Sequence, residues 1–368
     1  MKITVSESDL VNAINTVYRA VPSKTTMNIL KCILIDAAGQ KITFIANDME
    51  LGIQTSIEGT IEEKGIVAVD ADILSGIVRK LPDGDVLIET TDKSQIRIKC
   101  GSAKFEIGCN DGLEFTRLPE IEKNEGINVS EFTFREIINR TIFSISDNDS
   151  NKLMTGELLE IKDGNMRIVG LDGHRIAIRR TELNGSYSDR SVVIPGKTLG
   201  EVAKILPGDM DKQVSIFFTD KQVLFEFDET LVVSRLIDGE YFRIDQMLSD
   251  DYETKMTVNR QELQSCIDRA LLLVREGDKK PVVFSVTPAY VEIMISTDLG
   301  RMDENIVCNS EGREIMIGFN PKFLLDALRA IDDEEIDMYF VNPKAPCFIR
   351  NTEQTYNYVV LPVNFTTV

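Results

Sequence analysis

The sequence is poor in the residues that build metal sites and disulfide frameworks. It contains one histidine, His174, and its six cysteines include no pair with Cys-x-x-Cys spacing. We therefore expect no zinc site, no His-based metal site and no disulfide framework. Reduced thiols are typical of the cytoplasm, where we expect this protein to be located, and we expect no cofactor.

Long apolar segments are also lacking. No run of about 18 apolar residues is present, so nothing is expected to span a membrane. The first residues, "MKITVSESDL", lack the apolar core of a signal peptide. The composition, 43% hydrophobic and 27% charged over 368 residues, is that of a globular protein with two or three domains.

Positive charge is scarce. The chain has 41 Lys and Arg against 60 Asp and Glu, a net charge of −19. Taken alone, this charge opposes binding to the phosphate backbone of a nucleic acid.

What the chain does have is a threefold internal repeat. The segments "ITVSESDLVNAINTVYRAV", "INVSEFTFREIINRTIFSI" and "MTVNRQELQSCIDRALLLV" begin at Ile3, Ile127 and Met256. Each reads as a short strand that turns into an amphipathic helix. A good helix N-cap stands at each turn: Ser6, Ser130 and Asn259.

A second strand–helix series has nearly the same period, with Leu74, Leu199 and Leu324 spaced 125 residues apart. Hairpin-like pairs of strands close each copy. The pattern predicts an α+β fold of three repeated domains, each with two helices and mainly antiparallel sheet. The predicted domains are 1–125, 126–252 and 253–368.

The six predicted helices carry little net charge. They span 7–20, 70–80, 131–146, 196–205, 260–274 and 321–331, and together carry +1, which leaves −20 for the rest of the chain. On the second helix of each copy, Arg79, Lys204 and Arg329 lie about 150° from the centre of the apolar stripe. Arg140 and Arg269 share a register on the flank of the first helices.

Two interpretations of these cations stay open. Cations late in a helix stabilise its dipole. Alternatively, relatively basic helix faces on an acidic molecule could be presented to DNA.

The segment "LDGHRIAI", from Leu171 to Ile178, contains the only histidine. One interpretation is a tight hairpin turn at Asp172-Gly173. An Asp–His hydrolase dyad is poorly supported, because no GxSxG or other nucleophile motif accompanies it. A metal site is less well supported still.

Four motifs stand in a specific order: "MKITV" at the start, "GLDGHRIA" in the middle, "IGFNPKFLLDAL" in the third copy and "YVVLP" near the end. With the threefold repeat, they resemble the bacterial β sliding clamps, the processivity subunits of replicative DNA polymerase. The resemblance covers the whole chain. It implies a non-catalytic protein that forms a ring of two chains, head to tail, with twelve helices around the hole and sheets outside.

The size of such a ring agrees with this expectation. Twelve helices, each about 10 Å wide, make a circle roughly 38 Å across through their axes, leaving a hole of about 28 Å. Six helices would leave only about 9 Å, so one chain cannot encircle duplex DNA and two can. A closed ring is held on DNA by topology, so the acidic charge is no obstacle.

The resemblance also implies sites. A groove between the second and third domains would receive short peptides from the replicative polymerase alpha-type subunit, the clamp loader and other proteins with a clamp-binding motif. Its expected residues are Met154, Leu171, Gly173, His174, Arg175, Ile176, Phe242, Met247, Val359, Leu361, Pro362 and Val363. A mostly apolar cleft with adaptable methionines suits such peptides.

Further positions are implied for DNA and for the homodimer seam. The expected DNA-facing residues are Lys24, Arg79, Arg140, Lys152, Lys197, Lys204, Arg269 and Arg329. The expected seam residues are Lys104, Phe105, Ile107, Leu272, Leu273, Asp303 and Glu304.

The sequence departs from the family near the groove. Leu171, Phe242 and Gln246 stand where threonine, proline and arginine are common, and "VNFTTV" extends the C-terminus. An alternative function, a monomeric repeat scaffold that binds proteins but no DNA, also fits the acidic charge. An enzyme is a third and weaker alternative.

Overall fold

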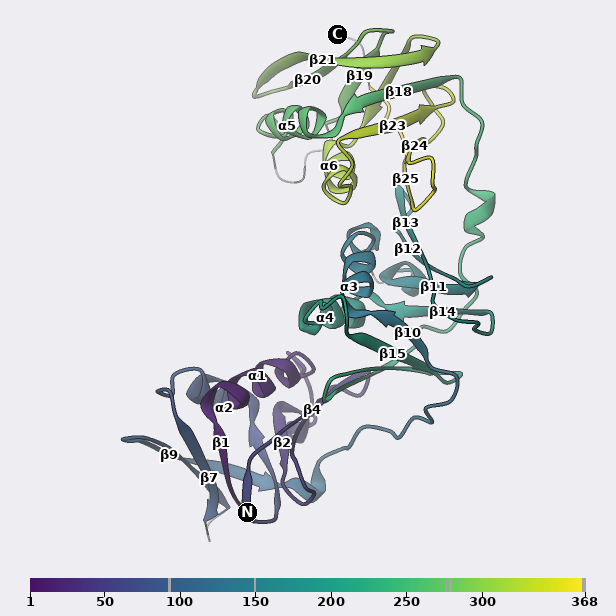
Figure 1. Cartoon of the computed structure of the whole chain (residues 1–368). Coiled ribbons are helices and arrows are strands. Elements are labelled where there is room, and N and C mark those ends of the chain that lie inside the picture. The colour runs from purple at the N-terminus through teal and green to yellow at the C-terminus, as the bar shows by residue number, and fades with distance from the viewer. Residues whose placement is uncertain (92–93, 149, 276, 278–279, 366–368) are drawn as a thin grey trace. The chain divides into compact units, whose positions relative to one another are not determined.

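The computed structural model describes residues 1–91, 94–148, 150–275, 277 and 280–365. These residues form six α-helices, each of which follows a β-strand directly or after one residue (Figure 1). The helices are α1 (Glu7–Tyr18), α2 (Ala71–Val78), α3 (Glu131–Asn139), α4 (Gly196–Ile205), α5 (Arg260–Leu271) and α6 (Pro321–Arg329). All six lie in the segments where the repeat predicts a helix.

Polar side chains cap the first turn of α1, α2, α5 and α6. The Ser6 hydroxyl accepts a hydrogen bond from the amide of Asp9 at 3.1 Å, and the Asn259 side chain accepts one from the amide of Glu262 at 3.0 Å. These two predicted N-caps are confirmed.

Most helices end earlier than predicted. The largest difference is in α3, which was expected to reach residue 146 and ends at Asn139. The Thr141 hydroxyl donates to the Ile137 carbonyl at 2.8 Å, and the chain continues as a 3-10 turn, Ile142–Ser144. A hydroxyl that bonds a carbonyl of the preceding turn competes with the helical pattern.

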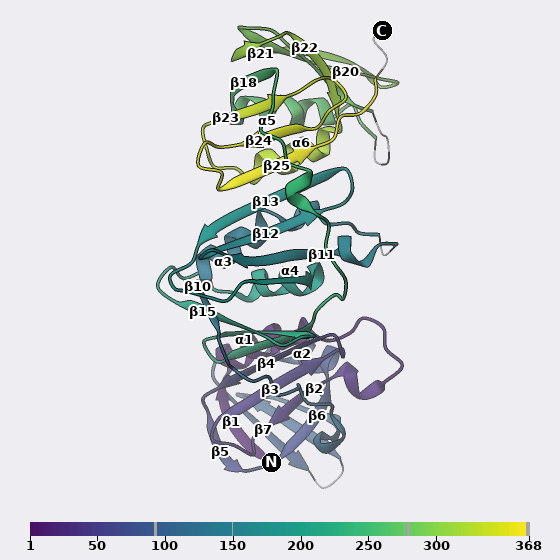
Figure 2. The ribbon, with the colours of Figure 1, turned by 90° about the vertical axis from the view of Figure 1, so that its right-hand side faces the viewer.

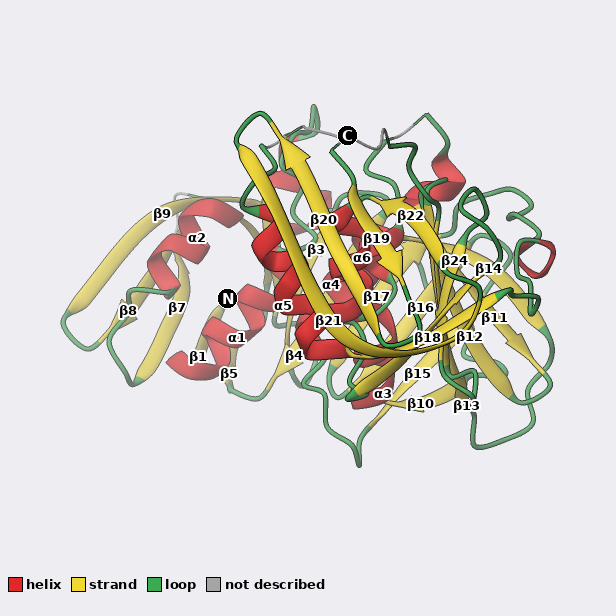
Figure 3. Cartoon of the chain, turned by 90° about the horizontal axis from the view of Figure 1, so that it is seen from above, coloured by secondary structure: helices red, strands yellow, loops and turns green. Residues whose placement is uncertain are grey.

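The first of two compact units comprises Met1–Phe132 and Lys204–Leu236. Its described strands form one antiparallel sheet in the order β10-β15-β16-β17-β4-β3-β2-β6-β9-β8-β7-β1-β5, and α1 packs beside α2 (Figure 3). The strands are β1 (Lys2–Ser6), β2 (Cys32–Asp36), β3 (Ile42–Asn47), β4 (Leu51–Ile57), β5 (Thr60–Glu63), β6 (Ile66–Asp70), β7 (Asp85–Thr91), β8 (Gln95–Cys100), β9 (Ala103–Asp111), β10 (Ile127–Ser130), β15 (Gln213–Phe218), β16 (Gln222–Phe227) and β17 (Thr230–Arg235).

The second unit comprises Thr133–Ala203 and Ile237–Val368. Its described strands are antiparallel in the order β14-β11-β12-β13-β25-β24-β23-β18-β21-β20-β19-β22, with α5 packed beside α6 and β13 next to β25 (Figure 2). The strands are β11 (Gly156–Lys162), β12 (Asn165–Leu171), β13 (Arg175–Glu182), β14 (Arg190–Pro195), β18 (Thr254–Asn259), β19 (Val282–Val286), β20 (Tyr290–Thr297), β21 (Gly300–Gly312), β22 (Ile315–Phe319), β23 (Glu335–Phe340), β24 (Cys347–Arg350) and β25 (Tyr356–Val360).

The apolar face of each helix forms the core, as the periodicity predicts. Leu74, Leu199 and Leu324, which mark the register of the repeat, are all buried. Burial of these large side chains supplies the main driving force for the helices to pack on the sheets. The predicted antiparallel α+β fold is therefore confirmed.

Both sheets continue across the expected domain limits, because β4 pairs with β17 and β13 pairs with β25. The segment 126–252 thus contributes strands to both sheets, and the predicted domain boundaries stay a prediction. In the described part of the chain, no helix is long and apolar enough to cross a membrane.

Candidate peptide-binding surface and nucleic-acid interface

The turn between β12 and β13 is organised by one carboxylate. Asp172 Oδ1 accepts hydrogen bonds from the amides of His174 at 2.9 Å and Arg175 at 3.0 Å. Gly173, between Asp172 and His174, has a φ of 87°, a conformation that favours glycine. The predicted tight turn is confirmed, and it presents His174 at the surface.

Arg175 is the most heavily bonded side chain of this region. Its Nε donates to Asp172 Oδ2 at 3.0 Å, its Nη1 to Asp326 Oδ2 at 2.6 Å, and its Nη2 to the Phe143 carbonyl. The guanidinium also lies over the Phe323 ring, 4.5 Å from its centroid.

The arginine is one of the residues expected in the peptide groove. It is almost fully buried, and it meets two carboxylates and a carbonyl within its own chain. Because Asp326 lies on α6, the arginine positions this helix beside the turn. Its contacts hold the turn, α6 and the backbone at Phe143 together.

His174 is not arranged for catalysis. Its ring stacks on Phe323 at 6.2 Å between centroids, with an interplanar angle of 22°. The carboxylate of Asp172 bonds backbone amides and Arg175, and within the described residues it accepts no hydrogen bond from the imidazole. The expected orientation of an Asp–His dyad is therefore lacking.

An apolar cluster lies behind the turn. Its buried members are Leu158, Leu171, Val169, Ile178, Val193, Tyr241 and Ile244, with Leu153, Met154, Ile176, Ile237, Phe242 and Leu248 packed against them. Four residues expected in the groove, far apart in sequence, are thus brought together: Met154, Leu171, Ile176 and Phe242. Two family departures, Leu171 and Phe242, are apolar and fit this cluster.

The other expected groove residues differ in exposure. Met247 and Leu361 are exposed, by 44% and 37%. Val359 and Leu171 are buried instead, so they support the surface from below. The Leu361 amide donates to the His174 carbonyl at 2.9 Å and fixes the end of β25 beside the turn.

The C-terminal extension begins at Val363, shortly after the end of β25. Pro362 and Val363 are half-buried, and the Val363 amide donates to the Gly318 carbonyl of β22 at 2.8 Å. The last three residues of the "VNFTTV" extension, 366–368, lie outside the described residues.

A buried carboxyl group lies on β11. Glu157 is fully buried, and among the described residues neither of its side-chain oxygens has a hydrogen-bond partner. Burial raises the pKa of Glu157 to about 8. At neutral pH an acid with this pKa is mostly protonated, and it lies on the same strand as Leu158 of the apolar cluster. The sequence does not reveal this, because a strand position carries no sign of whether an acid faces the core.

The residues expected to face DNA are mostly exposed. This holds for Lys24, Arg79, Lys152, Lys197, Lys204, Arg269 and Arg329. Arg140 is the exception, since it is half-buried and pairs with Glu136 at 2.6 Å and Asp332 at 2.5 Å. The prediction that Arg79, Lys204 and Arg329 point away from the core is confirmed.

Arg79, Lys204 and Arg329 occupy equivalent positions in the three repeats, and two of them form hydrogen bonds with a neighbouring helix. Arg79 donates from Nε to Asn15 Oδ1 of α1 at 2.9 Å, and Arg329 donates to Asp268 Oδ1 of α5 at 3.1 Å. Asn15 and Asp268 hold the same place in their repeats, so the contact itself is repeated. Arg269 pairs with Glu304, which was expected at the dimer seam.

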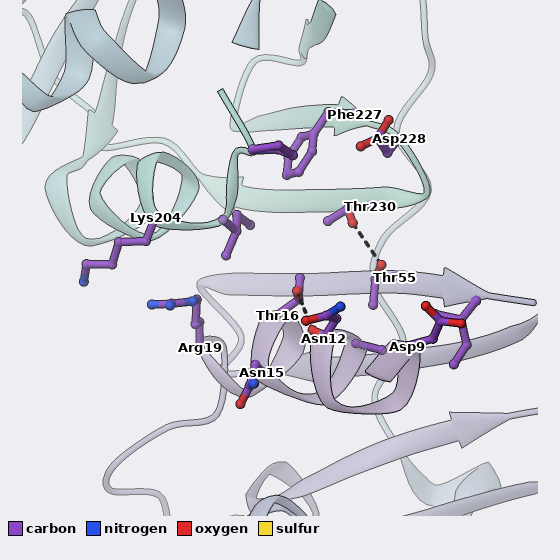
Figure 4. A pocket seen from close by; sticks show the side chains of 14 residues that line it. Asp9, Asn12, Asn15, Thr16, Arg19, Thr55, Lys204, Phe227, Asp228 and Thr230 are labelled. Atoms are coloured by element: carbon purple, nitrogen blue, oxygen red, sulfur yellow. Dashed lines mark hydrogen bonds between the residues drawn. The ribbon is translucent and has the colours of Figure 1, made fainter. Parts of the chain in front are cut away.

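A polar pocket of about 490 Å³ lies along the exposed face of α1. In Figure 4, Arg19 and Lys204 lie at one end of it, and Asp9 and Asp228 at the other. The sequence analysis did not include Arg19 among the outward-facing cations, because it considered only cations at equivalent positions of the repeats. The position of Arg140 and Arg269 is occupied by Thr16 in the first copy. The location of Arg19 at the C-terminal end of α1 was the signal that could have identified it.

The expected seam residues lie on two strands with similar pairing. In the described residues, β9 pairs with β8 through Ala103–Gly108 but with β6 only through Cys109–Asp111. Likewise, β21 pairs with β20 from Gly300 to Val307 and with β18 only from Cys308 onward. Each strand therefore has one unpaired edge, next to Lys104 and Phe105 in β9 and Asp303 in β21.

Possible metal ligands are dispersed. Across the described ranges, no three His, Cys, Asp or Glu side chains are grouped so that they could hold a metal ion. All six cysteines are free thiols, and Cys109 is the most accessible of them.

Comparisons with known proteins agree over the full length. Models of the N-terminal, central and C-terminal domains of the DNA polymerase III beta subunit match residues 1–119, 128–242 and 245–364. Proteins named beta sliding clamp from Bacillus subtilis and Staphylococcus epidermidis are 36% and 30% identical, with 99% of each chain covered.

Solved structures agree as well. A structure described as a DNA polymerase III beta subunit, from Eubacterium rectale, is similar with a TM-score of 0.96 and 55% identity, covering 99% of this chain and 100% of that one. The DNA polymerase sliding clamp of Bacillus subtilis also has a TM-score of 0.96, with 34% identity and 100% of both chains covered.

Proposed function

We propose that this chain, which belongs to the DNA polymerase III beta subunit family, is a sliding clamp that encircles duplex DNA as a head-to-tail homodimer and tethers the replicative polymerase. The observation that carries the proposal is the family's three-domain repeat, with exposed in-register cations on an otherwise acidic chain. The family is the non-catalytic processivity subunit, so we assign no reaction to this chain.

Weak electrostatics suit this function. A protein that neutralises many phosphates binds DNA tightly, and tight binding would oppose sliding. The cations Arg79 and Arg329 are partly engaged by Asn15 and Asp268, which softens their attraction for phosphates. Phosphate contacts carry no sequence information, so the ring would slide without preference for sequence.

The two unpaired strand edges support the homodimer. An exposed strand edge with free backbone groups is a template for pairing with another chain. Lys104 lies directly opposite Lys99 in the β8–β9 ladder, an unfavourable pair of like charges. An acidic partner edge containing Asp303 would relieve it, and Leu272, which is 79% exposed, would be covered.

The surface beside His174 supports the recruitment of partners. Leu361 and Met247 are exposed apolar side chains above a rigid apolar cluster. Short motifs bind such surfaces through one or two buried anchors, and flexible methionines adapt to different partners. We expect the polymerase alpha-type subunit, the clamp loader and other clamp-binding-motif proteins to compete for it.

The test is retention on DNA after loading by the cognate clamp loader. The solution mass should be near twice 41.3 kDa, and the loaded protein should stay on nicked circular DNA but leave linear DNA. The variant with Arg79→Glu, Lys204→Glu and Arg329→Glu should load or stay less well while the protein remains folded.

Other outcomes separate the alternatives. Equal loss from circular and linear DNA would refute topological binding. A strict monomer at micromolar concentration would favour the scaffold. Unchanged loading of the triple variant with lower thermal stability would favour the helix-dipole interpretation.

A further inference from the structure

The turn that carries His174 has a structural twin in the first repeat. Asp48 Oδ1 accepts from the amides of Glu50 at 3.0 Å and Leu51 at 2.6 Å, as Asp172 does in its own turn. Met49, the residue after Asp48, has a φ of 75°, close to the 87° of Gly173. A non-glycine residue in this conformation is strained, so its backbone is held by the surrounding structure.

The neighbouring strand is also duplicated. The Arg235 amide donates to the Glu50 carbonyl at 2.9 Å, the same distance that joins Leu361 to His174. The residues around these bonds pair in the same register, with Ser234 opposite Leu51 and Val360 opposite Arg175. We call the pairing of β4 with β17 the first junction and the pairing of β13 with β25 the second junction. Arg235 therefore holds the same position in the first junction as Leu361 does in the second.

The apolar support is repeated as well. Leu34, Ile45 and Phe115 are buried in one cluster, with Leu118 packed against it. Leu158, Val169 and Tyr241 hold the matching positions behind the His174 turn. Both turns are thus backed by a similar apolar layer.

A pocket of about 240 Å³ opens at this twin turn. It is lined by Asn47, Met49, Glu50, Gly52, Thr116, Arg117, Leu118, Pro119, Gln222, Val233 and Arg235. Gly52 occupies the position that Ile176 has in the second junction. A Cβ atom on Gly52 would lie 2.1 Å from a Leu118 methyl carbon, so Leu118 fills the space that corresponds to the Ile176 side chain.

The chemistry of the pocket differs from that of its twin. Arg235 is exposed, and among the described residues no carboxylate pairs with its guanidinium. Arg117 pairs with Asp36 at 2.7 Å, and Glu50 is the acid in the lining. Met49, 42% exposed, adds a flexible apolar contact.

We propose that this pocket is a second peptide-binding site, which takes a short partner segment with a carboxylate next to an apolar side chain. This proposal rests on the proposed function, because the backbone around the pocket repeats the backbone of the proposed peptide-binding surface beside His174. The carboxylate pairs with Arg235, and the apolar side chain packs on Met49 and Val233. On a chain of net charge −19, a local cation selects for an acidic segment.

The test uses methionine methyl NMR of the full-length protein, with Met49 and Met247 reporting on the two sites. The probe is the peptide acetyl-Leu-Asp-Leu-Leu-amide, with acetyl-Leu-Asn-Leu-Leu-amide as its uncharged control. We expect saturable shifts of the Met49 signal with the acidic peptide. The control peptide should bind the wild-type protein at Met49 about fivefold more weakly than the acidic peptide does. The acidic peptide should bind the Arg235→Ala variant about fivefold more weakly than the wild type.

A matched control is Arg313→Ala, which removes an exposed arginine outside the pocket and should leave the Met49 titration unchanged. No shift at Met49, or equal binding of both peptides to wild type and Arg235→Ala, would overturn the inference. A peptide with a polymerase clamp-binding motif tests the proposed function separately, through Met247. The two can therefore fail independently.

Discussion

The two strand junctions, β4 with β17 and β13 with β25, share a backbone and differ in their side chains. Leu51 is a buried apolar residue, whereas its counterpart Arg175 is a buried cation held by two carboxylates. Ile33 is a buried apolar residue, whereas its counterpart Glu157 is a buried acid. The same turn chemistry thus builds one junction stabilised by apolar packing and one that depends on polar contacts.

The difference teaches where specificity comes from in this repeat. Apolar groups at a junction contribute stability without fixing a particular neighbour. The guanidinium group of Arg175 requires specific hydrogen-bond acceptors on α6 and in the Asp172 turn. It therefore defines the geometry around His174. The second junction is therefore the more rigidly specified of the two, as a binding surface for defined motifs requires.

The largest effect should come from breaking the polar junction. Arg175→Ala leaves Asp172 and Asp326 without their cation and should destabilise the protein by about 3–5 kcal/mol. Arg175→Lys should recover less than half of this, because one ammonium group cannot reproduce the planar fork. The measurement is the urea unfolding midpoint of each variant.

The control for this prediction is Arg243→Ala, an exposed arginine whose loss should change stability by no more than about 0.5 kcal/mol. If Arg175→Ala and Arg243→Ala unfold at the same urea concentration, the two junctions do not differ in the way inferred.

A smaller effect should separate the junctions in peptide binding. Leu361→Ala and Met247→Ala should each weaken binding of a polymerase-derived clamp-binding peptide by on the order of 2 kcal/mol, about thirtyfold. His174→Ala should weaken it less, because the ring is already stacked on Phe323. Arg235→Ala, at the first junction, should leave this titration unchanged.

Fluorescence anisotropy of the labelled peptide gives these affinities, with the solution mass as a check that the dimer persists. Wild-type affinity in all three second-junction variants would rule out the assigned surface. A hydrolytic activity that depends on His174 would instead contradict the non-catalytic assignment.

A further effect should appear in the pH dependence of stability. The folded-state pKa of Glu157 is raised above its ordinary value of 4.5 to about 8, so the folded protein retains a proton that the unfolded chain releases. The stabilising contribution is full below pH 4.5 and is lost as the pH rises toward 8. The free energy of unfolding should fall by about 2.5 kcal/mol between pH 5.5 and 7.5 from this group.

Glu157→Gln should remove that fall, since a neutral amide does not titrate. Glu182→Gln, which replaces an exposed acid on β13, is the matched control and should keep the wild-type pH profile. Parallel profiles for wild type and Glu157→Gln, measured by urea unfolding, would show that Glu157 is not protonated in the folded state.

Much of the fold could be predicted because the signals are local. The caps at Ser6 and Asn259, the buried register leucine Leu74 and the turn at Asp172-Gly173 all depend on residues within a few positions of one another. Helix ends were less predictable. The side-chain bond of Thr141 competes with the helix there, and periodicity carries no sign of it.

The candidate site could be predicted only in part. Met154, Leu171, Ile176 and Phe242 were expected together through family resemblance, and the structure groups them. The roles of individual side chains were not predictable. Arg175 and Met247 were both expected in the groove, yet the first is almost fully buried and the second is 44% exposed. Exposure depends on which elements pack nearby.

By itself, the sequence determined the threefold repeat, the antiparallel α+β class and the outward direction of Arg79, Lys204 and Arg329. These follow from periodicity and turn chemistry, which act over a few residues. Only the tertiary structure decided that Arg175 bonds Asp326, 151 residues away, and that the His174 turn has a counterpart at Met49. It also decided that Glu157 is buried with no hydrogen-bond partner among the described residues. These depend on strand pairing and burial between distant segments, which no local pattern encodes.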